Sequence, residues 1–149
     1  MEQFLASLAS GDPESDPRAG AALHVALGAA LVARVARAGA GDRATEADAV
    51  RVEALAGASP GRVIELADRT LRLAEAVRPA APRAAVPRIA AAAEALRAAV
   101  GTARVDVEAD LVTDPAVRAE LLAAIEPVDD LVLRAAKLTA VVREQSLRM

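Results

Sequence analysis

One segment constrains the fold of this chain more than any other. Residues 18–38 are apolar on almost every face of a helix. Leu23, Leu27 and Leu31 recur at four-residue spacing, and valines and alanines occupy the remaining faces. A helix of a soluble protein that is hydrophobic all round must be surrounded by other elements. We therefore expect a buried central helix, enclosed within the subunit or shared with a partner subunit.

The composition extends this expectation to the whole molecule. Of the 149 residues, 41 are alanine, the strongest helix former, and 26% are charged. Residues 1–149 are predicted to form one all-α domain, a bundle of five to seven helices. Prolines, glycines and capping residues divide the chain into these expected helices: 2–9, 18–38, 46–56, 60–77, 87–100, 115–125 and 127–146.

A capping box at Thr45 indicates the start at 46, Gly57 the end at 56, and Ser59 followed by Pro60 the start at 60. The apolar period of 60–77 places Asp68 and Glu75 on the polar face and predicts this inner face: Val63, Leu66, Ala67, Thr70, Leu73, Ala74 and Val77. The inner residues predicted for 127–146 are Val128, Leu131, Val132, Ala135, Leu138 and Val142.

Two segments are expected to lie outside regular helices. Residues 1–17 form a leader in which the short first helix is followed by an acidic, proline-containing loop at 12–17. Residues 102–114 alternate valines with acids after Gly101, a residue typical of a helix end. A single strand would have no partner in so helical a chain, so this segment is predicted to be an irregular connection or a short helical turn.

Residue usage excludes several classes of function. The chain has no Cys, Trp, Tyr or Asn, so it has no disulfide, cysteine nucleophile, Cys/His zinc cluster or base-stacking platform. Its net charge of -3 and scattered arginines do not favour nucleic acid. The start of the chain does not resemble a secretory signal, and the longest uncharged run, 19–33, is shorter than a membrane span. The cytoplasm is the expected location, without a membrane partner.

Two groups of residues are candidates for chemistry. His24 is the only side chain whose ordinary pKa lies near neutrality, but its place between Leu23 and Val25 predicts a packed histidine with one local hydrogen bond. The carboxylates at 106, 108, 110 and 114 have a spacing that superficially matches a calcium loop, without its central glycine and terminal glutamate. A solvated acidic turn followed by a helix N-cap is the favoured interpretation, and no metal is expected.

The central segment carries a family resemblance. Residues 21–32, AALHVALGAALV, are similar to the first long helix of the formiminotransferase-cyclodeaminase C-terminal domain family, the cyclodeaminase/cyclohydrolase family. In that family a short leader helix and a Pro-Thr-Pro-Gly-Gly-Gly-Ser loop precede this helix, and the leader here is FLASLAS at 4–10. Val86-Pro87 resembles the family's Val-Pro helix start, and residues 110–112 resemble part of its Asn…Ser-Asp-Val segment.

The resemblance implies an all-helical homodimer that binds a tetrahydrofolate derivative at the subunit interface and needs no further cofactor. Its members release ammonia from a formimino group, as folate cyclodeaminases, or open the methenyl bridge with water, as methenyltetrahydrofolate cyclohydrolases. Carried over by residue, Asp110 is the candidate general acid or base. Arg18 and Ala19, at the start of the central helix, are the candidate substrate-binding residues, and Arg18 is expected to meet an anionic group there.

The chain also departs from the family pattern. The glycine trio becomes Asp16-Pro17-Arg18, the serine after it becomes Ala19, and the asparagine is absent. Glycines in such a loop allow a close approach to a ligand, whereas Pro17 fixes φ and removes a donor. The residues therefore leave two functions open: a short folate cyclodeaminase-like or cyclohydrolase-like protein, and a non-catalytic helical homodimer that acts as a structural or protein-interaction module.

Overall fold

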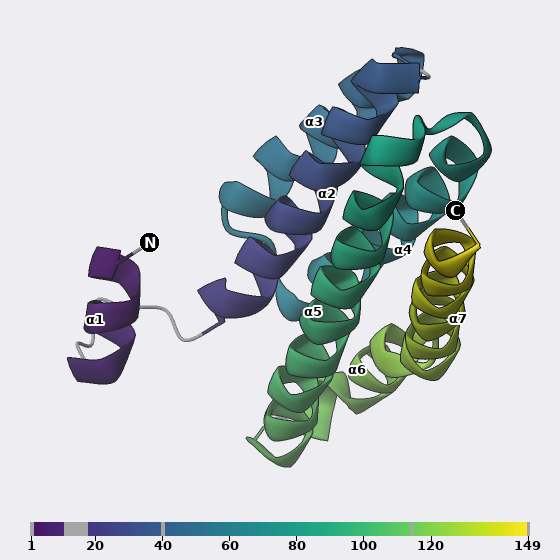
Figure 1. Ribbon diagram of the computed structural model, residues 1–149. Coiled ribbons are helices and arrows are strands. Elements are labelled where there is room, and N and C mark those ends of the chain that lie inside the picture. The colour runs from purple at the N-terminus through teal and green to yellow at the C-terminus, as the bar shows by residue number, and fades with distance from the viewer. Residues whose placement is uncertain (1, 11–17, 40, 114, 149) are drawn as a thin grey trace.

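The computed structural model describes residues 2–10, 18–39, 41–113 and 115–148, and within these ranges it contains helices and no strand. It is an all-α bundle with a central helix, as the sequence predicts (Figure 1). The predicted loop at 12–17 lies outside the described residues. The helices run in this order: α1 (Glu2–Ser10), α2 (Ala19–Gly39), α3 (Asp42–Leu55), α4 (Pro60–Val77), α5 (Val86–Thr113), α6 (Arg118–Ile125) and α7 (Val128–Leu147).

Helix α2 occupies the centre because its small residues permit close packing. It packs against α3, α4 and α5, and α7 covers the far side of α5. At Gly28 a Cβ atom would come within 2.9 Å of Cδ2 of Leu96 on α5, so the glycine lets the two helices approach. The buried side of α2 consists of Gly28 and of these residues: Ala21, Ala22, Val25, Ala26, Ala29, Val32, Ala33, Val35 and Ala36.

The leucines of α2 do not lie in the core, so the subunit itself does not enclose this helix on all sides, and of the two expected arrangements only a helix shared with a partner subunit stays a prediction. Leu27 is 52% exposed, and Leu23 and Leu31 are half-buried. Because the alanine and valine side of α2 faces the bundle, its four-residue leucine stripe points away from it. We call Leu23, Leu27 and Leu31 the leucine face. Val52 and Leu55 of α3 are exposed as well, at 61% and 54%.

Helix α3 begins earlier than the sequence suggests. The predicted start, a capping box at Thr45, lies inside the helix, which begins at Asp42 after Gly41 without a side-chain cap. Ala44 is buried, so packing in the core extends the helix backward by one turn. The predicted end is confirmed by Gly57, whose φ of 97° belongs to the left-handed region that glycine readily adopts.

Helix α4 follows its sequence signals closely. Ser59 caps the helix by accepting a hydrogen bond from the backbone N–H of Arg62 at 3.3 Å, and Pro60 occupies the first helical position, as predicted. The predicted inner face is buried. It comprises Val63, Leu66, Ala67, Thr70, Leu73, Ala74 and Val77.

Helix α5 corrects two predictions at once. It passes through Gly101 without ending and includes the segment predicted to be irregular, as far as Thr113. Ala99, Ala103 and Val107 are buried at four-residue spacing, so the inner face continues past the glycine. Of the two valines that alternate with acids after Gly101, Val107 is buried and Val105 is 63% exposed, so the alternation does not reflect the two faces of a strand.

The last helices lie near their predicted positions. The segment expected to be helical over 115–125 opens as a 3-10 turn at Pro115–Val117, followed by α6. Helix α7 matches the predicted final helix within about one residue at each end. Its predicted inner residues are buried except Val132, which is half-buried: Val128, Leu131, Ala135, Leu138 and Val142.

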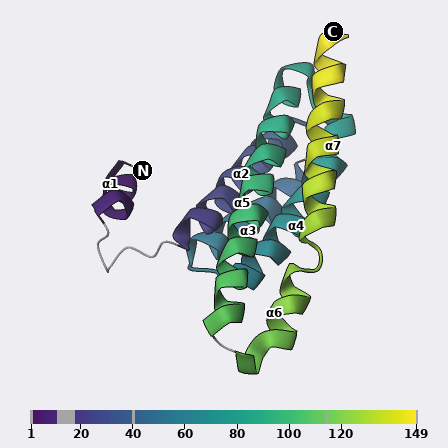
Figure 2. The same cartoon turned by 90° about the horizontal axis from the view of Figure 1, so that it is seen from below.

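Helix α1 confirms the predicted leader helix but does not join the bundle. In two perpendicular views it lies apart from the other helices (Figures 1 and 2). Within the described part of the chain no other helix packs extensively against it, and Leu5 is 56% exposed.

Candidate functional site

Two of the candidate site residues meet in the structure. A guanidinium nitrogen of Arg18 lies 2.5 Å from the carboxylate oxygen Oδ1 of Asp110, although 92 positions separate them in the sequence. Helices α2 and α5 are antiparallel, so the start of α2 lies beside the end of α5. Arg18 was expected to meet an anionic group, and here that group is a carboxylate of its own chain. A ligand that used Asp110 would have to displace this guanidinium or bind both side chains.

The space beside this ion pair is small. Arg18, Ala19, Leu23 and Leu55 line a hollow of about 100 Å³ between the start of α2 and the end of α3. Sites for small organic ligands typically have volumes of about 300–1,000 Å³. The hollow therefore accommodates a small group but not a molecule of the size of a reduced folate within a single subunit.

His24 lies on the exposed side of α2, so the prediction of a packed histidine is wrong. The predicted local hydrogen bond is present, because its Nδ1 lies 2.9 Å from the carbonyl oxygen of Gly20. Since a carbonyl oxygen only accepts, Nδ1 donates in this contact. The histidine is exposed for the same reason as the leucines, since it shares their side of α2.

The acidic segment forms part of α5 and does not form a turn. Glu108 pairs with Arg104 at 2.8 Å, and Asp110 pairs with Arg18. The predicted N-cap at Asp114 lies outside the described residues. Among the residues that the structure does describe, no three His, Cys, Asp or Glu side chains are grouped as metal ligands would be.

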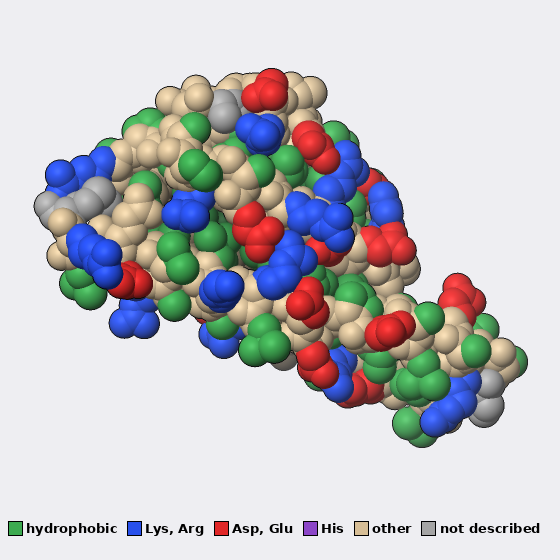
Figure 3. All heavy atoms as spheres, turned by 90° about the vertical axis from the view of Figure 1, so that its right-hand side faces the viewer, with side chains coloured by type: hydrophobic (Ala, Val, Ile, Leu, Met, Phe, Trp, Pro, Cys, Tyr) green, Lys and Arg blue, Asp and Glu red, His purple; other side chains and the backbone are tan. Residues whose placement is uncertain are grey.

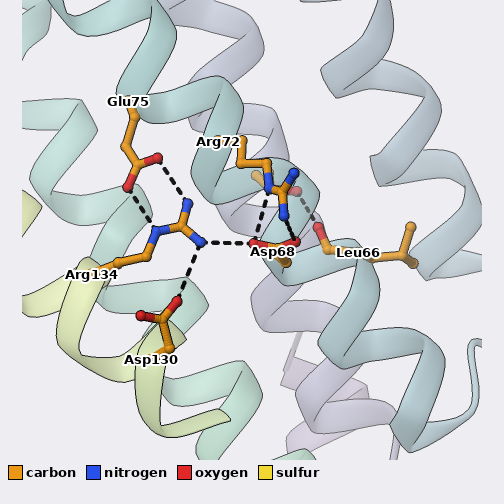
Figure 4. Close-up of polar contacts among 7 residues, drawn as sticks. Leu66, Asp68, Arg72, Glu75, Asp130 and Arg134 are labelled. Atoms are coloured by element: carbon orange, nitrogen blue, oxygen red, sulfur yellow. Dashed lines mark hydrogen bonds and ion pairs between the residues drawn. The ribbon is translucent and has the colours of Figure 1, made fainter. Parts of the chain in front are cut away.

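The most developed polar cluster was not predicted and links α4 to α7. Arg134 donates hydrogen bonds to both carboxylate oxygens of Glu75, at 3.2 and 2.8 Å, and to Oδ1 of Asp68 at 2.9 Å (Figure 4). Asp130 lies 3.8 Å away, and Arg72 pairs with Asp68. The hydrogen bonds to Glu75 are the largest cause that raises the pKa of the Arg134 guanidinium above its ordinary value, against the opposing effect of burial.

This cluster ties α4 to α7. Each charge in it has an oppositely charged neighbour, and the side of the molecule that carries α7 shows acidic and basic side chains interspersed (Figure 3). Sequence reasoning placed Asp68 and Glu75 on the polar face of α4 but had no signal for their partner. A pairing across 59 positions depends on how α7 packs against α4, which periodicity does not specify.

A larger hollow lies elsewhere, between α4 and α6. Its volume is about 600 Å³, and Arg62, Glu65, Asp68 and Glu120 line it together with small residues. Arg62 is held by Glu53 and Glu65 at 2.6 and 2.5 Å. None of the candidate site residues named from the sequence reaches this hollow.

The length and hydropathy of helix α2 also bear on function. By length and composition it could cross a membrane, and 56% of its most apolar window is buried inside the bundle. The core helix of a soluble protein and a signal sequence near the N-terminus both pass the same test of length and hydropathy.

Comparison with known protein families, characterised proteins and solved structures finds no match for this chain. The resemblance to the cyclodeaminase family stays a prediction from the sequence.

Proposed function

We propose that the protein is a non-catalytic helical homodimer whose copies associate through the leucine face of α2, and that it acts as a structural or protein-interaction module in the cytoplasm. The exposure of Leu27 carries this proposal, since Leu27 is 52% exposed at the middle of a run of 15 uncharged residues. Exposed apolar side chains that adjoin one another support an interaction site.

The surroundings of Leu27 support the same proposal. Leu23 lines the small hollow at the end of α3 together with Leu55, so the leucine face continues onto α3. Val52 lies one helical turn before Leu55 and is also exposed. A second copy that covered these side chains would remove a continuous apolar surface from water, which is the main driving force of association.

The proposal is tested by the solution mass of the unmodified protein, measured by light scattering over a concentration series. One chain has a mass of 15.2 kDa, so a homodimer has twice that mass, about 30 kDa. The expected result is a dimer that dissociates only on dilution. A mass of one chain at every concentration would contradict the proposal and would leave the leucine face to a different protein.

A catalytic function is the second candidate, and one observation favours it. The structure brings together Arg18 and Asp110, two residues that the family resemblance singles out independently. In this alternative the protein binds a tetrahydrofolate derivative as a cyclodeaminase or cyclohydrolase, and the partner subunit enlarges the small hollow beside Arg18.

The two candidates are separated by calorimetric titration with 5-formyltetrahydrofolate. The proposed module gives no saturable heat. Saturable binding that Asp110→Asn and Arg18→Ala weaken, in a dimer that remains folded, would favour the enzyme. Asp129→Asn is the matched control, because Asp129 is an exposed aspartate on α7.

A further inference from the structure

We infer that the leucine face of each copy is covered by helix α1 of the other copy, so that the two subunits exchange their N-terminal helices. This inference rests on the proposed homodimer and names the segment of the partner that completes its interface. It joins two apolar surfaces that the single chain leaves open: the leucine face and the exposed side of α1 at Leu5.

Helix α1 needs a surface to be stable. It has nine residues, and no other described helix packs extensively against it. Isolated helices shorter than about 12–15 residues are marginal in water, because the cost of nucleation is spread over few hydrogen bonds. The segment FLASL at 4–8 is largely apolar, so it gains stability as a helix when its apolar side chains are buried.

The two surfaces match in length. A rise of about 1.5 Å per residue makes α1 about 13 Å long, and the same rise places Leu23 and Leu31 about 12 Å apart along α2. Helix α1 therefore covers the leucine face from end to end without leaving a turn unsupported.

The charges of the two segments are opposite. Residues 2–17 include four acids, Glu2, Asp12, Glu14 and Asp16, and no lysine or arginine. Helix α2 contains two arginines, Arg34 and Arg37, and no acid, and Arg37 already pairs with Asp48 of α3. Arg34 is exposed, and no ion pair joins it to another described residue. Of the four acids Glu2 lies on α1, and its charge is opposite to that of the exposed Arg34, which favours the association of α1 with α2 of a partner.

The partner's α1, not the chain's own, is the inferred occupant. Eight residues, 11–18, connect Ser10 to α2 and span at most about 30 Å when extended, which is enough to reach the chain's own leucine face. The structure nevertheless leaves that face open, with α1 away from the bundle (Figure 2). When two copies exchange their α1 helices, the leucine face and the apolar side of α1 are both buried in each copy, in a closed, two-fold arrangement.

The absence of cysteine from the chain makes a cross-linking experiment clean. One variant carries Ala9→Cys, on the same side of α1 as Leu5, and a second carries Ala30→Cys, half-buried beside Leu27 and Leu31. The two variants are co-expressed with different tags and treated with a short bis-maleimide. The expected result is a covalent product that contains both tags. The matched control replaces Ala30→Cys by Ala136→Cys, an exposed site on α7, and gives no such product.

Other outcomes overturn the inference in distinguishable ways. A dimeric mass without the mixed product, or cross-linking of Ala30→Cys only to itself, would show that another part of the partner covers the leucine face and would leave the homodimer intact. An intramolecular product in the double variant, with a monomeric mass, would show that α1 folds onto its own chain. A monomeric unmodified protein would remove the homodimer and the exchange together.

A pair of point variants gives a second readout. Leu5→Asp places a charge on the inferred contact side of α1 and is expected to lower the dimer fraction at least tenfold, whereas Gln3→Asp on the opposite side leaves it unchanged. Equal dimer fractions for both variants would contradict the exchange, and helical content measured by circular dichroism checks that the bundle remains folded.

Discussion

At the scale of single residues, the glycines of α2 differ in the space around them. At some of them a side chain would clash with neighbouring atoms, and at others a side chain has room. Gly39 ends α2 against the turn after α4, where a Cβ atom would clash with the carbonyl oxygen of Ala80. Gly39→Ala is expected to lower the free energy of unfolding by about 1–3 kcal/mol, because backbone must move to make room. Urea denaturation measures this change.

Gly20→Ala is the matched control for Gly39→Ala. It lies on the same helix, and a Cβ atom there meets nothing within 4 Å. Because alanine is the better helix former, stability should stay the same or rise slightly. Equal losses at both positions would mean that α2 does not end against the Ala80 turn.

At the scale of elements, the continuity of α5 is the feature that most needs a test. Gly101 lies in the middle of this helix, and a Cβ atom there has no neighbour within 4 Å. Gly101→Ala is therefore expected to raise the free energy of unfolding by about 0.5–1 kcal/mol. A loss of stability would show that Gly101 adopts a helix-ending conformation, as the sequence alone suggests.

The link between α4 and α7 makes a second prediction at this scale. Arg134→Met keeps the apolar stem but leaves Glu75 and Asp68 without their shared cation, and is expected to cost about 1–2 kcal/mol. Arg148→Met removes an exposed pair with Glu144 near the end of α7 and should cost almost nothing. Similar losses in thermal or urea denaturation would contradict the role given to Arg134.

The sequence predicts well those features that local interactions determine, and it predicts poorly those that depend on contacts between residues distant in sequence. Ser59 and Pro60 set the start of α4 through local capping, so the sequence locates it correctly. Gly101 and Thr45 carry local signals that packing overrides, since buried alanines on either side continue the helices. The Arg134 cluster and the contact of Arg18 with Asp110 depend on the arrangement of helices distant in sequence, which no local pattern specifies.

At the scale of the whole molecule, the orientation of α2 decides which of its apolar side chains are buried and which stay on the surface. An all-apolar helix was correctly expected at the centre, but periodicity did not reveal which of its faces would be buried. Small residues allow the closest approach to α5, so the alanine and glycine side turns inward and the leucines turn outward. This orientation buries the small residues in the core, and it also leaves the leucine face on the surface, where a partner can bind.

The most direct test of this account is the solution mass of Leu27→Asp beside that of Leu133→Asp. Both leucines are exposed, at 52% and 69%, and Leu133 lies on α7 away from the leucine face. We predict that Leu27→Asp remains folded by circular dichroism but has the mass of one chain, whereas Leu133→Asp remains a dimer. A dimeric Leu27→Asp, or a Leu27→Asp that unfolds, would contradict the assignment of the leucine face as the exposed interface.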